Sequence, residues 1–380
     1  MNETNEKSEI HRGLKGVYFD RSQVCYIDGR AGELRYRGYS IHDLAERSTF
    51  EETCCLLFCG ELPTRDQLER FASDLKAART LPEAIYRLIE IVKAAHPMDV
   101  LRTAVSALAA FDPDVADNSR EAILRKGIRL TSQVPMIVAA HQHIRSGRPL
   151  VAPDPALGHA ANFLYMLKGS APSADAARLM DIDMILHAEH GSNASSFTAR
   201  VVAGTEANLH AAVTAAVAAL SGPAHGGAAE NVMTMAQEIG EAANVAEYVR
   251  RKRGNREPVM GFGHRVYRAE DPRARHMRAG VEKLSREMGQ PKWYQILEAL
   301  VEAMKPYARH GVNVNVDFYA GVVYYLNGIP ADLFVPIFAV GRVPGWTVQV
   351  LEQMQNNILI RPLTLYNGPA PREYVALDKR

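Results

Sequence analysis

Helical periodicity is the feature that most constrains this chain, because it runs through most of the sequence after Tyr39. Apolar residues recur at helical spacing between positions 88 and 92, and the Ala-rich segment LHAAVTAAVAAL suits helices packed closely in a large bundle. Ser40 and Thr49 are placed to cap helices that open with IHDLAE and FEETCCLLF. The pattern predicts a mostly α-helical fold.

A short region before these helices follows a different pattern. Polar and apolar residues alternate between positions 16 and 40, and Asp28-Gly29 marks a tight turn, so we expect a small N-terminal β region. A chain of 380 residues suits two or three domains. After the helix that ends at Gly222-Pro223 the chain carries RRKRGNR and GFGHR, then returns through LFVPIFAVGRVPGW and a helix to an extended tail. We expect a large helical domain of residues 1–224 and 326–380, and a small domain of residues 225–325.

The overall charge and apolar content exclude several classes of function. The 44 basic and 43 acidic side chains give a formal charge of +1, so no global field attracts nucleic acid or anionic lipid. No apolar stretch approaches the 18 residues that a membrane span needs, and we expect none. The first residues, MNETNEKSEIHR, lack the features of a secretion or transit signal, so the cytoplasm is the expected location.

The four cysteines predict neither a disulfide framework nor a zinc site. Cys25, Cys54, Cys55 and Cys59 are few for so long a chain, and they lack paired CxxC spacing. Three of them lie in the apolar run CCLLFC, for which we expect burial in a helix.

Three histidines, His190, His225 and His264, stand in glycine-rich or polar surroundings that suit acid–base chemistry near neutral pH. In LHAEHGSNASS, His187 and His190 are three apart, which places them on one helical face as either a metal pair or a buried imidazole beside a ligand-facing one. His225 in SGPAHGGAAEN precedes two glycines, whose backbone could approach an anionic or enolate oxygen. A helix-capping role for His225 is an equally good interpretation.

The third of these histidines belongs to EPVMGFGHRVYRAEDPRA, where two glycines would let a loop wrap a substrate. The arginines that follow could hold carboxylates or phosphates by paired hydrogen bonds; they are Arg265, Arg268, Arg273 and Arg275. The dinucleotide motif GxGxxG is incomplete, because Val266 stands at its third glycine. The run from Arg250 to Arg253 is most simply a solvated face, although it could also meet phosphate groups.

Asp317 lies in VNVNVDFYAGVVYY, where apolar and aromatic neighbours would desolvate its carboxylate and make it a stronger base. A helix N-cap or a buried ion pair is the alternative role. Arg342 and Arg361 are isolated in apolar or proline-containing segments, and buried arginines usually have an anionic partner. Together these residues predict a site for a small dianion, with acid–base chemistry next to a carbonyl and no redox cofactor.

Eight segments in order along the chain give it a resemblance to the citrate synthases, in their shorter bacterial and archaeal form. They are YIDGRAGELRYRGYSIHDLAE, HPMDVLRTAVSAL, ANFLYMLKG, LHAEHGSNASSFTARV, LSGPAHGGAAENV, MGFGHRVYRAEDPRA, VNVDFYAGVVYY and GRVPGWTVQVLEQ. The resemblance implies a mostly α-helical homodimer whose small domain closes over the substrates. It also implies condensation of acetyl-CoA with oxaloacetate and water to citrate and CoA, through an enol or enolate and citryl-CoA, with no metal or organic cofactor.

The resemblance implies a role for each matching residue. Asp317 would take a methyl proton from acetyl-CoA, His225 would hold the thioester oxygen, and His264 would protonate the oxaloacetate carbonyl. Oxaloacetate would be bound by His190, Arg273, Arg342 and, reaching into the other subunit's site, Arg361. Coenzyme A would contact Pro258, Val259, Met260, Gly261 and Phe262, with Arg250, Arg251 and Lys252 near its phosphates. We expect His225 to act as a neutral donor, because an imidazolium would pair with Asp317 and weaken the base.

Three alternatives stay open at this point. A 2-methylcitrate synthase has the same fold and residues but acts on propionyl-CoA; Leu186, where an aromatic residue would be expected in that enzyme, favours the citrate reaction. A metal-dependent hydrolase would use His187 and His190 as ligands and lose activity with a chelator. A helical scaffold without catalysis would be insensitive to substitution of Asp317.

Overall fold

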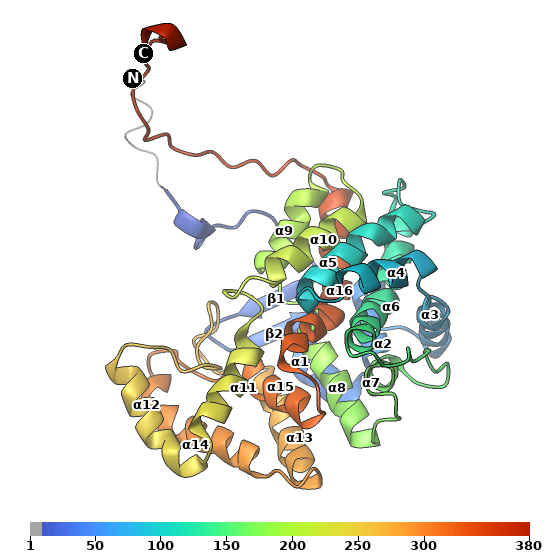
Figure 1. Ribbon diagram of the computed structural model, residues 1–380, viewed down its shortest axis with the longest axis vertical. Helices are drawn as coiled ribbons and strands as arrows, with labels where there is room; N and C mark the ends of the chain where they lie inside the picture. Colours follow the sequence, from blue (N-terminus) through green and yellow to red (C-terminus); the bar gives the residue numbers. More distant parts are fainter. Residues whose placement is uncertain (1–9) are drawn as a thin grey trace.

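The fold is dominated by α-helices, as the periodicity predicts. The computed structural model describes residues 10–380, and this range contains sixteen α-helices and one three-stranded sheet (Figure 1). The α-helices are α1 Ile41–Arg47, α2 Phe50–Cys59, α3 Arg65–Ala77, α4 Glu83–Val92, α5 Pro97–Leu108, α6 Arg120–Arg145, α7 His159–Lys168, α8 Ala174–His187, α9 Ala194–Ala203, α10 Leu209–Leu220, α11 Ala228–Ile239, α12 Val245–Gly254, α13 Ala274–Glu287, α14 Lys292–Ala308, α15 Asp317–Leu326 and α16 Phe334–Gln355. The predicted fold class is therefore confirmed.

The β region is an antiparallel sheet of order β1-β2-β3, formed by β1 Cys25–Asp28, β2 Glu33–Tyr36 and β3 Tyr39–Ser40. The turn predicted after β1 is present: Asp28 Oδ1 accepts hydrogen bonds from the N–H groups of Arg30 and Ala31 at 2.8 and 2.9 Å. Tyr36 is fully buried, and its hydroxyl donates to the Glu189 carbonyl at 2.8 Å. The sheet is thereby fixed beside the segment that follows α8.

The first two helices begin where their capping residues predict. Ser40 Oγ accepts from the N–H of His42 at the start of α1, and Thr49 Oγ1 accepts from the N–H of Glu52 at the start of α2, each at 3.2 Å. Each bond satisfies an N–H group that a helix N-terminus leaves free, which stabilises the helix by about 0.5–2 kcal/mol. α2 ends at Cys59, and its C-cap is Gly60, whose φ of 96° favours glycine.

α16 lies at the centre of the protein and contains prolines. The sequence pattern predicts connecting chain for the segment that carries them. The structure corrects this: LFVPIFAVGRVPGW is helical from Phe334 onward, and one helix continues through Pro344. Pro336 lies in the first turn, where its missing N–H would have had no helical partner. α16 packs on α6, α8, α9 and α10, and this packing outweighs the hydrogen bond lost at Pro344.

The same region corrects a second expectation, that no segment is long and apolar enough to cross a bilayer. The 25 residues from Ala331 to Gln355 meet that criterion by length and composition. In the structure their most apolar window is 94% buried inside the protein. A helix that is apolar on all sides is expected at the core of a large protein as well as in a membrane, so this stretch is weak support for a span.

Helices α11 to α15 lie together at the lower left of Figure 1. α15 packs on α11 and α13, and α12 packs on α14. Contacts of α13 with α8, and of α11 with α16, join this group to the other helices. The division into a large domain of residues 1–224 and 326–380 and a small domain of residues 225–325, and the closure of the small domain over a substrate, stay predictions.

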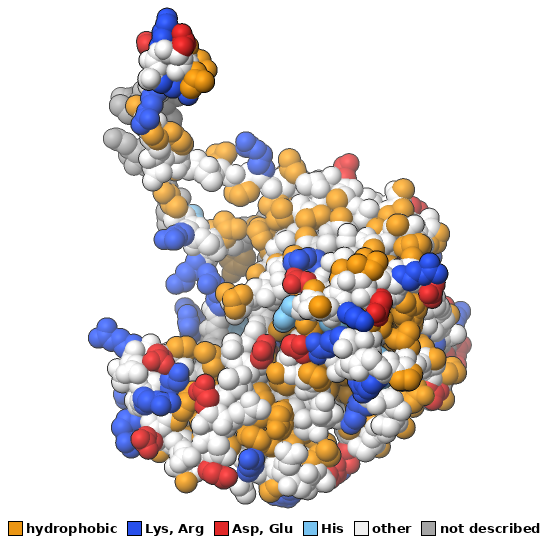
Figure 2. All heavy atoms as spheres, in the orientation of Figure 1, with side chains coloured by type: hydrophobic (Ala, Val, Ile, Leu, Met, Phe, Trp, Pro, Cys, Tyr) orange, Lys and Arg blue, Asp and Glu red, His pale blue; other side chains and the backbone are white. Residues whose placement is uncertain are grey.

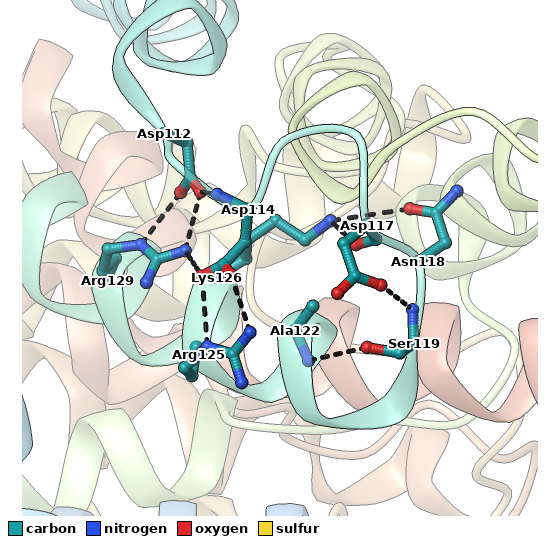
Figure 3. Close-up of polar contacts among 9 residues, drawn as sticks. All are labelled: Asp112, Asp114, Asp117, Asn118, Ser119, Ala122, Arg125, Lys126 and Arg129. Carbon is teal, nitrogen blue, oxygen red and sulfur yellow. Dashed lines mark hydrogen bonds and ion pairs between the residues drawn. The ribbon is translucent and has the colours of Figure 1, made fainter.

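An ion-pair cluster fastens the loop before α6 to the first turns of that helix (Figure 3). Arg129 donates to Asp112 at 2.6 Å and to Asp114 at 2.7 Å, and Arg125 donates to Asp114 at 2.6 Å. Hydrogen bonds from Arg125 and Arg129 hold the pKa of Asp114 below its usual range. The loop is therefore held by charge rather than by regular secondary structure.

After α16 the chain leaves the body of the protein as the extended tail that the sequence predicts (Figure 1). Residues 356–380 form no α-helix or strand, and their one regular element is a 3₁₀ turn at Leu377–Lys379. Large apolar side chains on the tail are exposed, among them Ile358 (70%), Leu363 (87%) and Tyr366 (74%). Arg361 lies on this tail and is exposed as well.

Candidate active site

The GFGHR loop is bonded to the segment that leads into α15. The Gly263 N–H donates to the Asn313 carbonyl at 2.7 Å, and the Asn315 N–H donates to the Gly261 carbonyl at 2.9 Å. The Asn315 side chain donates to the Gly263 carbonyl at 3.1 Å. Since Asp317 is the first residue of α15, these bonds fix its distance from the histidine that follows Gly263.

Gly261 shows why glycine is needed in this loop. Its φ is 77°, and a Cβ at this position would lie 2.5 Å from the Phe318 ring. Neither the backbone conformation nor the available space suits another residue. The neighbouring Phe262 packs on the same ring, with centroids 4.9 Å apart, so the loop lies directly against the start of α15.

The surroundings of His264 assign its tautomer. Nδ1 accepts the N–H groups of Val266 and Tyr267 at 3.0 and 3.1 Å, so a neutral ring must carry its proton on Nε2. Burial, assisted by the Arg273 charge, lowers the pKa of His264 to about 4. At neutral pH the ring is therefore an uncharged donor through Nε2.

His190 lies beside this ring. α8 ends at His187, so His190 follows the helix, and the two histidines do not share one helical face as the spacing predicts. His190 Nε2 is 3.1 Å from the Tyr267 hydroxyl, and the rings of His190 and His264 are 5.3 Å apart. Burial lowers the pKa of His190 well below its usual value. The structure thus brings two of the three predicted histidines together.

His187 and His190 are both buried, and His187 bonds Asp183. Its Nδ1 lies 2.9 Å from the Asp183 carbonyl and 3.3 Å from the Asp183 carboxylate. Tyr324 donates its hydroxyl proton to the other carboxylate oxygen of Asp183 at 2.6 Å. His187 and His190 therefore bond different protein groups, and the part of the chain that the structure describes holds no group of three or more His, Cys, Asp or Glu side chains suited to a metal ion.

The partners of His225 assign the opposite tautomer. Nε2 accepts the N–H of Ser195 at 3.3 Å and lies 2.9 Å from Ser195 Oγ, so a neutral ring carries its proton on Nδ1. Burial, with a contribution from Arg342, lowers the pKa of His225 to about 4. The helix-capping alternative is wrong, because the N-cap of α11 is Gly227 and no side chain donates or accepts a capping hydrogen bond there.

Asp317 stands at the start of α15 in an environment that favours the protonated form. Burial raises the pKa of its carboxyl group, and the charges of His187 and Arg273 oppose this shift. The N-cap of α15 is Val316, so Asp317 is not the cap that the alternative interpretation proposes. Because burial makes the charged form of this carboxylate costly, its affinity for a proton is higher.

Arg342 is a buried cation with unused hydrogen-bonding capacity. Its Nε donates to the His187 carbonyl, while Nη1 is buried without a partner among the residues that the structure describes. Burial lowers the pKa of Arg342 to about 10, and Glu189 opposes this shift. A buried N–H donor without an acceptor is costly, and an anion placed there would satisfy it.

Glu189 and Phe338 complete this part of the site, and the sequence analysis missed both. Glu189 is fully buried, accepts from Gln349 at 2.8 Å, and has its pKa raised to about 7 by burial. Phe338 lies between the rings of His187 and His225, at centroid distances of 4.6 and 6.2 Å, with the Arg342 guanidinium 4.7 Å from its ring. A carboxylate between two histidines in HAEHG was an available signal for Glu189.

Arg273 is also buried, and Asp271 holds it in place. Nε and Nη2 donate to the two oxygens of Asp271 at 2.9 and 2.7 Å. Burial alone would raise the pKa of Asp271, but the paired guanidinium lowers it instead. The pair fixes the direction of Arg273, and the spacing D-x-R in EDPRA was the signal that could have shown it.

The remaining predicted residues lie outside this cluster. Arg250 and Arg251 are exposed on α12, and Lys252 pairs with Glu257 at 2.7 Å. Figure 2 shows basic side chains over α12 with acidic ones among them. In the loop before Gly261, Pro258 is exposed, Val259 is buried and Met260 is partly buried. Arg361, on the tail after α16, is exposed.

Most of this chain matches one known protein family, and its relatives carry two related names. Residues 13–363 match the family described as citrate synthase, C-terminal domain. A citrate synthase of Deinococcus radiodurans is 42% identical over 375 residues, covering 98% of this chain and 100% of the relative. A 2-methylcitrate synthase of Corynebacterium glutamicum is 41% identical over 379 residues, covering 98% and 99%.

Solved structures agree with this similarity. The crystal structure of citrate synthase from Pyrobaculum aerophilum is 39% identical and superposes with a TM-score of 0.93, covering 98% of this chain and 95% of that chain. The citrate synthase of Thermoplasma acidophilum, solved as a ternary complex with carboxymethyl coenzyme A and oxaloacetate, is 30% identical. Its TM-score is 0.91, with 98% and 100% of the two chains covered.

Proposed function

Because this chain belongs to the citrate synthase family, a family of acyltransferase enzymes, we propose that its site condenses acetyl-CoA with oxaloacetate and water to give citrate and CoA. The observation that carries the proposal is Arg342, a buried cation whose Nη1 has no partner among the described residues. A carboxylate of a small dicarboxylate would supply that partner. The oxaloacetate in the Thermoplasma acidophilum complex supports this ligand class.

We assign proton removal to Asp317. A thioester α-proton is far less acidic than a carboxyl group, so the base needs both a desolvated position and donors for the oxyanion that develops. Burial raises the pKa of Asp317 and so strengthens the base. The raised pKa and the fixed position beside the GFGHR loop support this role.

We assign the thioester oxygen to His225. The Ser195 contacts are made to Nε2, so a neutral His225 ring has its N–H donor at Nδ1. A neutral donor can stabilise the enolate without forming an ion pair that would weaken the base. The pKa of about 4 supports a ring that is uncharged at neutral pH.

We assign carbon–carbon bond formation to the side of the site that holds His264. As the methylene carbon attacks the ketone carbon of oxaloacetate, His264 Nε2–H would deliver its proton to the ketone oxygen. His190, Arg273 and Arg342 would orient the dicarboxylate, which turns a two-substrate collision into a local step. Water would then hydrolyse the citryl-CoA thioester and release CoA. We propose that these residues perform every step without a metal or organic cofactor.

We propose that coenzyme A lies along Pro258 to Phe262, with Arg250, Arg251 and Lys252 available to its phosphates. The exposed basic end of α12 supports this placement. We further propose that the protein works in the cytoplasm, which its similarity to bacterial and archaeal citrate synthases supports.

The choice of acyl group is the first experimental test. We expect kcat/KM for acetyl-CoA to exceed that for propionyl-CoA by about 10- to 200-fold, because one additional methylene in an apolar pocket changes transition-state binding by about 1–3 kcal/mol. The measurement is steady-state thiol release at saturating oxaloacetate. A higher kcat/KM for propionyl-CoA would instead assign the chain to the 2-methylcitrate reaction. A relative named 2-methylcitrate synthase is nearly as similar to this chain in sequence as a relative named citrate synthase.

We also propose that the protein is a homodimer in which the tail of one subunit reaches the site of the other. Exposed Ile358, Leu363 and Tyr366 support this, because apolar side chains in such number on an extended segment need a second surface to cover them. Arg361 is exposed on its own chain, which leaves its guanidinium group available to a site on another copy.

Mixed dimers test the tail directly. Asp317→Asn and Arg361→Ala subunits should each be poorly active alone, yet co-expressed subunits should recover about a quarter of wild-type activity. Half of the dimers would be mixed, and each would contain one site with an intact base and an intact partner arginine. Activity that stays at the level of the parent variants would show that Arg361 does not act across subunits.

A further inference from the structure

Two cysteine thiols meet at the C-terminal end of α2. Cys55 and Cys59 are four residues apart on one helical face, and their sulfurs lie 3.8 Å apart. Cys55 is 2% exposed, whereas Cys59 is exposed, which corrects the expectation that all three cysteines of CCLLFC are buried. One sulfur is therefore accessible to small molecules in solution, and the other lies directly behind it.

Two arginines stand at the same helix end. Arg37 donates to the Leu57 carbonyl at 2.9 Å, and Arg120 donates to the Phe58 carbonyl at 3.4 Å. These carbonyls belong to the last turn, which otherwise carries the negative end of the helix dipole. The guanidinium groups offset that end and place positive charge beside Cys59.

The charge distribution favours a thiolate on the exposed member of the pair. The hydrogen bond from Cys55, supported by Arg120 and Arg37, lowers the pKa of Cys59 to about 6. The same bond, together with burial, raises the pKa of Cys55. At neutral pH the nucleophilic sulfur is the accessible one, and its neighbour keeps its proton.

We propose that Cys59 and Cys55 form a peroxide-oxidisable dithiol, in which Cys59 reacts with hydrogen peroxide and Cys55 converts the product to a Cys55–Cys59 disulfide. The Cys59 thiolate attacks one peroxide oxygen, the S–O bond forms, the O–O bond breaks and hydroxide leaves. Cys55 sulfur then attacks Cys59 sulfur, the S–S bond forms, the S–O bond breaks, and the Cys55 proton passes to the departing oxygen, which leaves as water. The two thiols lose two electrons, and hydrogen peroxide is reduced to water.

The helix end can accommodate this bond with limited movement. Cβ atoms four apart in an α-helix are separated by about 5–6 Å, and a disulfide needs about 3.5–4.5 Å, so the last turn must tighten. Cys59 is the final residue of α2, and Gly60 after it is already in the left-handed region with open space around its Cα. A bond formed in this way is strained, and we expect common dithiols to reduce it readily.

The other two thiols lack these features. Cys54 is fully buried beside Cys55, and burial raises its pKa. Cys25 lies in β1 at the side of Glu189, where burial and that carboxylate raise its pKa. Both sulfurs are therefore protonated at neutral pH and slow to react with peroxide.

The test is the intact mass of the full-length, reduced protein after treatment with hydrogen peroxide at pH 7. We expect a loss of about 2 Da that a dithiol reductant reverses. Cys59→Ser should abolish the loss. Cys55→Ser should abolish it too, and should instead leave a sulfenic acid at Cys59 that a dimedone probe captures.

Cys54→Ala is the matched control, because it removes the adjacent thiol and leaves the pair intact. It should retain the 2 Da loss. If this variant folds poorly, fragmentation of the oxidised wild-type peptide spanning residues 48–65 should still show which two sulfurs are joined. No mass loss in the wild type, oxygen addition alone, or a disulfide that includes Cys54 would overturn the proposal.

Discussion

Replacing Asp317 by Asn is expected to lower kcat by about 10²- to 10⁴-fold, the usual contribution of a positioned general base. An amide has nearly the same shape as the carboxylate but cannot accept the methyl proton, so the fold and the dicarboxylate site should survive. The measurement is steady-state thiol release with acetyl-CoA, together with the dissociation constant for oxaloacetate. We expect the dissociation constant to change little, because the loss occurs in the transition state.

A matched substitution separates chemistry from structure. Asp332→Asn makes the same change in a carboxylate that pairs with Arg145 outside the site, and kcat should stay within about twofold of wild type. Full activity in the Asp317→Asn enzyme would show that Asp317 is not the base of the reaction.

The second large effect concerns the tautomer of His225. Replacement by Gln should lower kcat by about 10²- to 10³-fold, the cost of losing one oxyanion donor, and replacement by Asn should lower it less. The Asn amide nitrogen stands where Nδ1 is, whereas the Gln amide nitrogen stands where Nε2 is. Since the Ser195 contacts place the proton on Nδ1, Asn should retain about tenfold more activity than Gln, the value of one hydrogen bond.

Both variants should be assayed from pH 6 to 8, where a ring with a pKa of about 4 is neutral. We expect the ratio of wild-type activity to the activity of each variant to be flat across this range, because His225 does not titrate within it in the wild type. Full activity of His225→Gln would refute a donor role. Equal losses in the two variants would refute the Nδ1 tautomer.

Local features of the fold were predictable from the sequence. The caps at Ser40 and Thr49, and the turn at Asp28, depend on side chains that bond backbone groups two or three residues away. Such bonds need only the local chain to form, so composition and spacing are enough to find them.

Features that depend on distant contacts were not predictable in this way. α16 contains Pro344 and reads as connecting chain, yet packing against four helices keeps it helical. Cys59 follows the apolar pattern of α2 and is nonetheless exposed, because the helix ends there. The helicity of α16 depends on contacts that lie far away in the sequence, and the exposure of Cys59 depends on where α2 ends.

The same distinction between local and distant contacts applies to the candidate site. Histidines and arginines in unusual surroundings were visible as single residues, but their states depend on partners remote in sequence. Ser195 sets the tautomer of His225 from 30 positions away, and Gln349 bonds Glu189 from 160 positions away. The pairing of Arg273 with Asp271 is local, so attention to the DPR spacing would have found it.

The bonds between the GFGHR loop and residues 313–315 have a consequence for how this enzyme could be altered. They join the segment that carries His264 to the one that carries Asp317, so hydrogen bonds hold together the two residues that we propose transfer protons. Arg342 belongs to another element, α16. Changes around Arg342 could therefore retune the enzyme for a different oxo acid while leaving the spacing of acid and base as it is.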